Sequence, residues 1–269
     1  MTRKEAKKLL DISFAVLAPY FKKKFGFFPN FKIRFCPPSK SLLKQKVPFY
    51  MDNKGGLVVF PEHIKEDCLM PLLEKSKREH YCAVGYWLYA VAHDLVHFVH
   101  CQFIGKDAFT KYSNLVYIEG VAEIVSWEIL SEIYAECRLM DDFKRGTSPL
   151  KFLCEAMQEK KLRESIEKIL LWFAKAHAKG LRRVGKRFVA PSFLPPKIKN
   201  SIKRLIKSNP APRRKASNAG HCTKRNRGWL PYSLGLWYTN KLFQSGKGFK
   251  WLVSHLLSEE ELSRRAKKR

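Results

Sequence analysis

The chain has 269 residues, which is enough for one large domain or two small ones and for a sizeable core. A hydrophobic share of 45% and an aromatic share of 13% exclude an intrinsically disordered protein. The 52 lysines and arginines outnumber the 24 aspartates and glutamates, so the formal net charge is +28. Such a charge attracts nucleic acid, anionic lipid or acidic proteins without choosing among them, and it also suits a chain that is basic for solubility alone.

The cysteines and the N-terminus indicate the compartment. The seven cysteines form no C-x-x-C pair and are odd in number, which favours free thiols in a reducing environment over a disulfide framework. The basic and then apolar N-terminus is interrupted by Asp11, so it predicts an amphipathic helix rather than a signal peptide. No apolar run approaches the length of a membrane span. We therefore expect an intracellular, cytoplasmic protein without a transmembrane segment.

Hydrophobic periodicity predicts a helix, two short strands and three further helices in the first half of the chain. Apolar residues at helical spacing mark residues 5–24, where Pro19 is expected to bend or divide the helix. The alternation over 31–36 predicts a half-buried strand, and the apolar run 57–60 predicts a second, edge-like strand. The further helices are predicted over 62–76, 79–105 and 115–137.

The charge balance changes abruptly in the second half. Residues 51–160 hold 12 lysines and arginines against 17 acidic residues, whereas residues 161–230 hold 20 against 2. The basic stretch predicts helices around 161–178 and 197–207, followed by a proline-rich loop to Arg227. Two more helices are expected over 229–242 and 247–257, ahead of a basic tail.

The most informative motif is the His-Asp-Leu-Val-His run that begins at His93 and ends at His97. Two histidines four residues apart face the same side of a helix, so both imidazoles can reach one metal ion. With Glu119 on the next predicted helix, they make the ligand set of a catalytic zinc site that leaves one position open. Asp94 is suited to take a proton from water, although it is one methylene shorter than the glutamate of the usual H-E-x-x-H pattern.

Two neighbours of Glu119 add to this pattern. Gly120 is small enough to let its helix approach a neighbouring element closely. Glu123 lies one turn further on the same face, where it is suited to hydrogen-bond a histidine ligand without binding the metal itself.

With these residues the chain resembles the gluzincin zinc metallopeptidases, which combine H-E-x-x-H with a downstream glutamate in an E-G-x-A motif. It is most similar to the small predicted zinc proteases with a minimal core of this kind, and a late Y-x-x-G segment at Tyr232 extends the resemblance. The resemblance implies an α+β fold with a mostly helical zincin-like core, a small N-terminal sheet and an active-site helix pair. It also implies that His93, His97 and Glu119 bind Zn2+, that Asp94 is the general base, and that Tyr232 steadies the oxyanion.

The same resemblance implies a domain organisation and a reaction. Residues 1–140 and 229–258 are expected to form the metallopeptidase-like core. Residues 141–228 would then be a basic, partly helical insertion, and residues 259–269 a basic tail. The expected reaction is hydrolysis of a peptide bond in a peptide or protein substrate by metal-activated water.

A different function is also compatible with the sequence. Asp94 stands in place of the usual glutamate, which also fits a catalytically inactive protein with the same scaffold. Such a protein would bind nucleic acid or an acidic partner through residues 161–230. Basic and aromatic residues alternate there, and such residues contact phosphates and stack on unpaired bases. A solvated insertion without a ligand fits the same composition.

The metal site itself could also be built from a different set of residues. A histidine-aspartate dyad is typical of HD phosphohydrolases, in which His63 and either Asp141 or Asp142 would complete the site. That fold is all helical and does not explain the predicted strands. His100, one turn beyond His97, could also replace a ligand.

Overall fold

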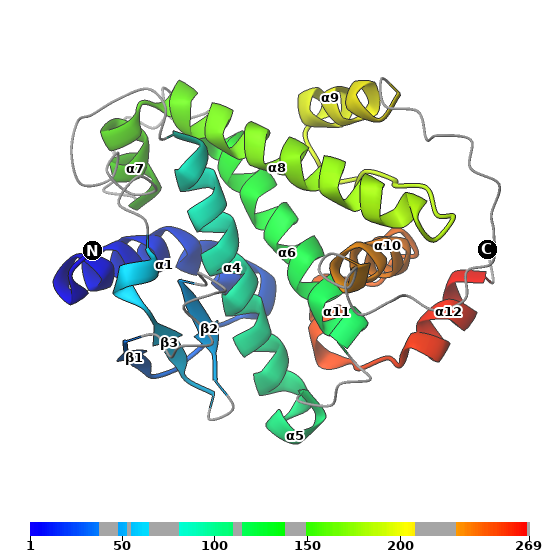
Figure 1. Cartoon of the computed structure of the whole chain (residues 1–269), viewed down its shortest axis with the longest axis horizontal. Coiled ribbons are helices and arrows are strands. Elements are labelled where there is room, and N and C mark those ends of the chain that lie inside the picture. The colour runs from blue at the N-terminus through cyan, green and yellow to red at the C-terminus, as the bar shows by residue number, and fades with distance from the viewer. Residues whose placement is uncertain are drawn as a thin grey trace.

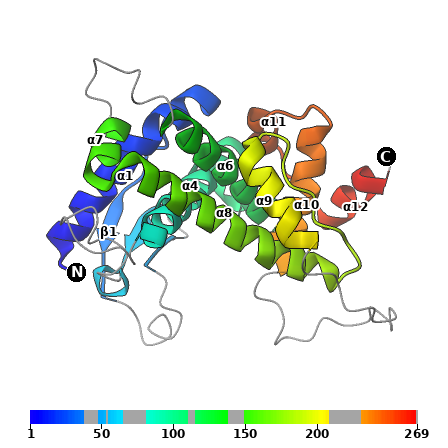
Figure 2. The same ribbon diagram turned by 90° about the horizontal axis from the view of Figure 1, so that it is seen from above.

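The structure, a computed structural model, describes residues 1–37, 48–52, 55–64, 81–109, 115–137, 149–207 and 230–267. Two long helices, α4 (Tyr81–Ile104) and α6 (Leu115–Glu136), lie side by side at its centre (Figure 1). Helix α1 (Arg3–Phe25) and a small sheet lie on one flank of this pair. Helix α10 (Leu230–Gln244) and the C-terminal helices lie on the other (Figures 1 and 2). Covered from both flanks, α4 and α6 are apolar around most of their circumference.

The sheet has three strands, β1 (Ile33–Phe35), β2 (Phe49–Met51) and β3 (Leu57–Val59), in the order β1-β3-β2. Strand β3 pairs parallel with β1 and antiparallel with β2. The strand predicted over 57–60 is therefore confirmed, but its predicted edge position is wrong, because β2 covers its second side. Strand β2, which is only three residues long, was not predicted from the sequence. Its hairpin to β3 is closed by Asp52, whose carboxylate accepts the Gly56 N–H at 2.8 Å.

Helix α1 is a single helix with defined ends. Thr2 and Glu5 form a capping box at its start, in which the Glu5 N–H donates to Thr2 Oγ1 at 3.3 Å and the Thr2 N–H donates to Glu5 at 2.7 Å. Gly26, at φ 92°, closes the other end in the left-handed conformation that glycine adopts readily. Pro19 lies inside the helix without dividing it.

Of the other helices, only α8 (Glu159–Arg182) is long among the described residues. The rest are η1 (Pro61–His63), α5 (Lys106–Phe109), α7 (Pro149–Met157), α9 (Pro196–Lys207), α11 (Phe249–Ser254) and α12 (Glu259–Lys267). The helices predicted around 161–178 and 197–207 are thus confirmed as α8 and α9, while α5, α7 and α12 were not predicted. Most of the helix predicted over 62–76 and the loop predicted over 208–227 lie outside the described residues. Within the described ranges, no helix is both long and apolar enough to cross a membrane.

Helix α8 belongs to the core although its sequence is basic. Its apolar residues recur every three or four positions and are buried, and the helix crosses over α4 and α6 (Figure 1). At the crossing with α4, the Gly85 N–H donates to Ser165 Oγ at 2.8 Å, and a Cβ on Gly85 would lie 2.7 Å from the Ser165 carbonyl oxygen. A mostly helical fold with a small sheet is consistent with the α+β prediction; the predicted domain boundaries stay a prediction.

Helices α6 and α10 approach each other closely at two glycines. A Cβ built on Gly120 would lie 2.3 Å from backbone atoms of Gly235, and one on Gly235 would lie 2.2 Å from the Val116 carbonyl oxygen. Thr239 Oγ1 donates to the Gly120 carbonyl at 2.9 Å beside this contact. The prediction that Gly120 permits a close approach is confirmed, and the neighbour is α10.

Candidate metal centre

His93 and His97 on α4 and Glu119 on α6 meet where the two helices face each other. Nε2 of His93 lies 3.1 Å from Oε2 of Glu119, and Nε2 of His97 lies 3.6 Å from the same oxygen. One ligand atom from each residue lies within 4.8 Å of the other two. Only 10% of the His93 side chain, 12% of the His97 side chain and 13% of the Glu119 side chain are exposed. The cluster is largely shielded from solvent but not sealed.

The spacing of these atoms fits one metal ion. In a tetrahedral zinc site, bond lengths of roughly 2.0–2.2 Å place neighbouring ligand atoms about 3.3 Å apart. The distances of 3.1 and 3.6 Å to Glu119 lie on either side of that value. Imidazole nitrogen and carboxylate oxygen are also donors that zinc accepts. Across the described residues, this is the one group of three such side chains with suitable spacing, and it can hold a metal ion.

The three side chains are electrostatically matched. Burial raises the pKa of Glu119, but the neighbouring His97 and the hydrogen bonds from His93 and His97 outweigh burial and hold the pKa of this carboxyl well below its usual range. Burial lowers the pKa of His93, yet the hydrogen bond to Glu119 and its charge raise that pKa to about 9. The site therefore holds a negative oxygen directed at the two rings, as a cation site requires.

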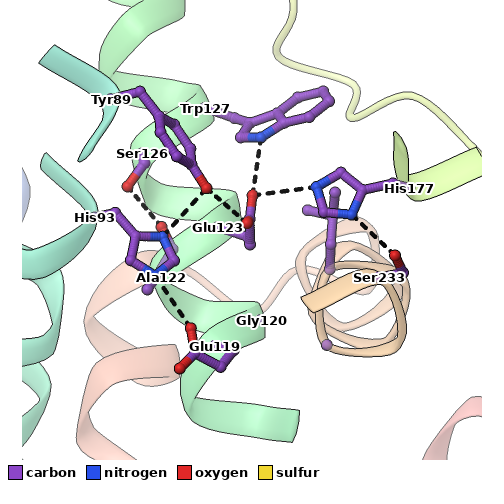
Figure 3. Close-up of polar contacts among 12 residues, drawn as sticks. Tyr89, His93, Glu119, Gly120, Ala122, Glu123, Ser126, Trp127, His177 and Ser233 are labelled. Atoms are coloured by element: carbon purple, nitrogen blue, oxygen red, sulfur yellow. Dashed lines mark hydrogen bonds and ion pairs between the residues drawn. The ribbon is translucent and has the colours of Figure 1, made fainter. Parts of the chain in front are cut away.

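A hydrogen-bond network contacts His93 at Nδ1, the ring nitrogen that does not face Glu119 (Figure 3). Nδ1 of His93 lies 3.4 Å from the hydroxyl of Tyr89, which donates to Oε1 of Glu123 at 2.6 Å. Nε1 of Trp127 donates to Oε2 of Glu123 at 3.1 Å. Glu123 was expected to bond a histidine ligand, and the structure places Tyr89 between the two residues. The predicted role of Glu123 outside the ligand set stays a prediction.

The network also includes His177, which, like Tyr89, sequence reasoning missed. His177 on α8 lies 3.3 Å from Oε2 of Glu123 through its Nε2, and its Nδ1 lies 3.2 Å from Oγ of Ser233 on α10. The charge of His177 outweighs the burial of Glu123, so the pKa of the Glu123 carboxyl lies below its ordinary value. The sequence signal for His177 is a histidine on an otherwise apolar helical face. For Tyr89, the signal is its position one turn before His93.

Asp94 lies beside the triad but faces an apolar environment. It lines a small cavity between α1, the sheet and α4, whose other walls are Leu10, Phe14, Phe49, Leu57, Val91, Leu95 and Phe98. Burial raises the pKa of Asp94 to about 6, against the opposing effect of His97 and His93. Tyr232, at the start of α10, is also close to the site, with its ring centroid 6.1 Å from that of His93. Burial raises the pKa of Tyr232 above its ordinary value, and so do nearby carboxylates, so its hydroxyl is a proton donor.

His100 and His63 lie apart from the triad. His100 is fully buried, and its Nε2 lies 3.1 Å from the carbonyl oxygen of His255. His63 lies at the end of η1, beside Phe60, and is not part of the metal-capable group. Asp141 and Asp142 lie outside the described residues. The structure thus brings the predicted triad together, without His63 or His100.

Comparison with known proteins adds no relative. No protein-family model, no curated protein and no solved structure matches the chain. What the molecule itself establishes is a mostly helical fold and a His-His-Glu cluster that can hold a metal ion.

Proposed function

We propose that the protein is a zinc-dependent, metallopeptidase-like hydrolase with the gluzincin arrangement of ligands. The observation that carries this proposal is the convergence of His93, His97 and Glu119, from two helices, at distances suited to one ion. When bound, zinc supplies Lewis acidity and lowers the pKa of water to about 7. The substrate of this reaction is a peptide or protein.

The remaining roles belong to side chains around the triad. Asp94 takes the proton from the attacking water and later gives it to the leaving amine. With a pKa of about 6, this carboxyl is close to the range in which a general base exchanges protons efficiently near neutral pH. Tyr232 donates its hydroxyl proton to the carbonyl oxygen that becomes negative. The raised pKa of Tyr232 keeps that proton available.

Metal content and peptide hydrolysis test this proposal together. The purified protein is expected to bind one zinc ion per chain and to lose it when His93 is changed to Ala. Cleavage of a mixed peptide library is expected to stop with Asp94→Asn and to rise with Asp94→Glu, because the longer side chain reaches the water more easily. Absence of bound zinc under any loading condition would overturn the proposal. Zinc binding without cleavage by either the parent or Asp94→Glu would remove its catalytic part.

A second candidate function, nucleic-acid binding, rests on the charge of the other flank. Residues 168–258 contain 21 lysines and arginines and no aspartate or glutamate. In the described part of this stretch, basic side chains lie against aromatic rings of α10, with Lys186 Nζ 4.0 Å and Lys241 Nζ 4.3 Å from the ring centroid of Trp237. Basic residues beside a partly exposed aromatic ring suit phosphates and unpaired bases.

Fluorescence anisotropy with a labelled single-stranded oligonucleotide tests this second function. Binding is expected to weaken steeply as salt rises, and to weaken with the pair Lys186→Glu and Lys241→Glu. The matched control is Lys7→Glu, on α1 at the opposite flank. Equal loss in the control, or no dependence on salt, would argue against this face. Binding of polyglutamate in place of the oligonucleotide would indicate an acidic protein partner instead.

A further inference from the structure

Four buried side chains connect the metal triad to helix α8. From His93, the path runs through Tyr89 and Glu123 to His177 (Figure 3). We propose that Tyr89 and His177 are positioning residues of the metal centre. In this proposal Tyr89 fixes the orientation and tautomer of His93, and His177 compensates the charge of Glu123, on which Tyr89 depends. This inference rests on the proposed metal site.

The hydroxyl of Tyr89 has a single proton, so it donates one hydrogen bond. The ionised Glu123 carboxylate can only accept hydrogen bonds, so Tyr89 donates its proton to Oε1 at 2.6 Å. Toward His93, the same oxygen can then only accept, over 3.4 Å. A metal bound at this site would replace the proton that Nε2 of His93 donates to Glu119, and the proton left on His93 would then be the one on Nδ1, held by Tyr89. The lone pair of Nε2 would be free for the metal.

Burying the charged carboxylate of Glu123 costs free energy unless hydrogen bonds or an opposite charge compensate it. It is 0% exposed, as is His177. Its Oε1 accepts from Tyr89 and its Oε2 from Trp127, and Nε2 of His177 lies 3.3 Å from Oε2. Removing one member of a buried pair leaves the other charge uncompensated. Without His177, Glu123 would be driven toward its neutral form, and Tyr89 would lose its strong acceptor.

Ser233 has a supporting role in the network. Its Oγ lies 3.2 Å from Nδ1 of His177 and so orients the ring toward Glu123. Serine, histidine and glutamate in this order resemble a hydrolytic triad, but Ser233, His177 and Glu123 are each 0% exposed. A substrate cannot reach a serine buried in this way, so the arrangement serves position rather than nucleophilic attack.

The network acts on one ligand only. Nδ1 of His97 is buried and has no hydrogen-bond partner among the described residues. His93 is thus held from both of its ring nitrogens and His97 from one. Loss of the network should loosen His93 without removing any ligand atom, which predicts weaker metal binding and an altered coordination geometry.

The test compares two tyrosine-to-phenylalanine variants of the full chain, both read out by metal binding. Tyr89→Phe is expected to raise the zinc dissociation constant about 10- to 100-fold, as loss of a ligand's outer partner does. The same variant is expected to shift the visible absorption of the cobalt(II)-loaded protein. The matched control is Tyr117→Phe, since Tyr117 is also buried and donates to a carbonyl, that of Leu252, outside the network. The control should stay within about threefold of the parent.

His177→Gln supplies a second variant that keeps the proposal testable if Tyr89→Phe does not fold. It should weaken zinc binding less than Tyr89→Phe, and the double variant should be no weaker than Tyr89→Phe alone, because both act through one path. If the parent binds no zinc or cobalt, the proposed function itself fails. If the parent binds the metal but Tyr89→Phe binds it equally tightly with an unchanged spectrum, the proposed function stands and only this inference is overturned.

Discussion

Helix α4 carries two buried histidines, seven residues apart, whose surroundings differ in one decisive respect. His93 lies beside Glu119, and its pKa is raised to about 9. His100 lies two turns further along, where burial lowers its pKa to about 4 and its ring partner is the carbonyl oxygen of His255. Burial is common to both, so burial alone does not place a histidine in the metal-capable cluster. The difference is the carboxylate supplied by α6.

The first prediction tests the difference between His93 and His100 by removing the charge of Glu119. Glu119→Gln is expected to weaken zinc binding more than about 100-fold, because loss of a ligand exceeds the 10- to 100-fold cost of losing an outer partner. Isothermal titration or competition with a chromogenic chelator measures the change. The matched control, His100→Gln, removes a buried histidine outside the site and should leave zinc affinity unchanged. Equal losses in both variants would contradict the assignment of Glu119.

The second prediction disturbs the position of α6, which brings that carboxylate to α4. Gly120→Ala would place a methyl group 2.3 Å from backbone atoms of Gly235, where neither helix can yield locally. We expect the free energy of unfolding to fall by about 3 kcal/mol or more. Glycine-to-alanine changes inside a helix ordinarily stabilise by about 1 kcal/mol, so the sign itself is informative. Gly248→Ala, with no atom within 4 Å of its Cβ, is the control for urea unfolding.

The third prediction uses pH to sharpen the difference between the two histidines. Because the pKa of His100 is lowered from 6.5 to about 4, the unfolded chain binds this proton more readily between those values. Stability is therefore lost as pH falls from 6.5 toward 4, and it is unaffected above that window. The contribution is roughly 3 kcal/mol, at about 1.4 kcal/mol per pH unit.

Chelator-treated parent and His100→Gln proteins, unfolded in urea at pH 7 and at pH 4, measure this effect. The parent should lose roughly 3 kcal/mol more than the variant over this interval. Parallel pH profiles would show that His100 is not held neutral by the fold.

The smallest expected effect on zinc affinity concerns Asp94, whose carboxylate lies near the triad but outside it. Asp94→Asn should change zinc affinity by less than the roughly 10- to 100-fold cost of losing a ligand's outer partner, because Asp94 lies outside the metal-capable group and contributes charge but no ligand bond. The same titration as for Glu119→Gln measures it, so the two carboxylates are compared directly. A loss as large as that of Glu119→Gln would mean that Asp94 binds the ion.

Long, strongly periodic helices were predictable from sequence, and short elements were not. Apolar spacing over more than twenty residues indicates α4 and α6 from local information alone. Strand β2 has three residues, too few to show a period, and it exists because β3 offers a hydrogen-bonding edge. Helix α12 is strongly charged and is anchored by the buried Leu262, a contact that no local pattern reveals. Tertiary pairing decides such segments.

The same limit applies to the site. His93 and His97 share a helix, so their juxtaposition follows from spacing. Glu119 required one further step, the pairing of two helices, for which Gly120 was the sequence signal. His177 is 54 residues from Glu123, on a helix whose composition suggested a peripheral insertion, and only packing shows that it meets the network. The hydrolytic activity and the zinc remain proposals.

The contact between Gly120 and Gly235 also sets a rule for recognising relatives of this chain. Neither position can carry a side chain while the two backbones keep their present separation, so both must stay glycine or change together with the helix geometry. One glycine directly follows Glu119, the proposed ligand, and the other comes three residues after Tyr232. A distant relative is therefore expected to retain this spaced glycine pair even where its histidine motif has diverged. This glycine pair reflects the backbone packing alone, whether or not a relative binds a metal.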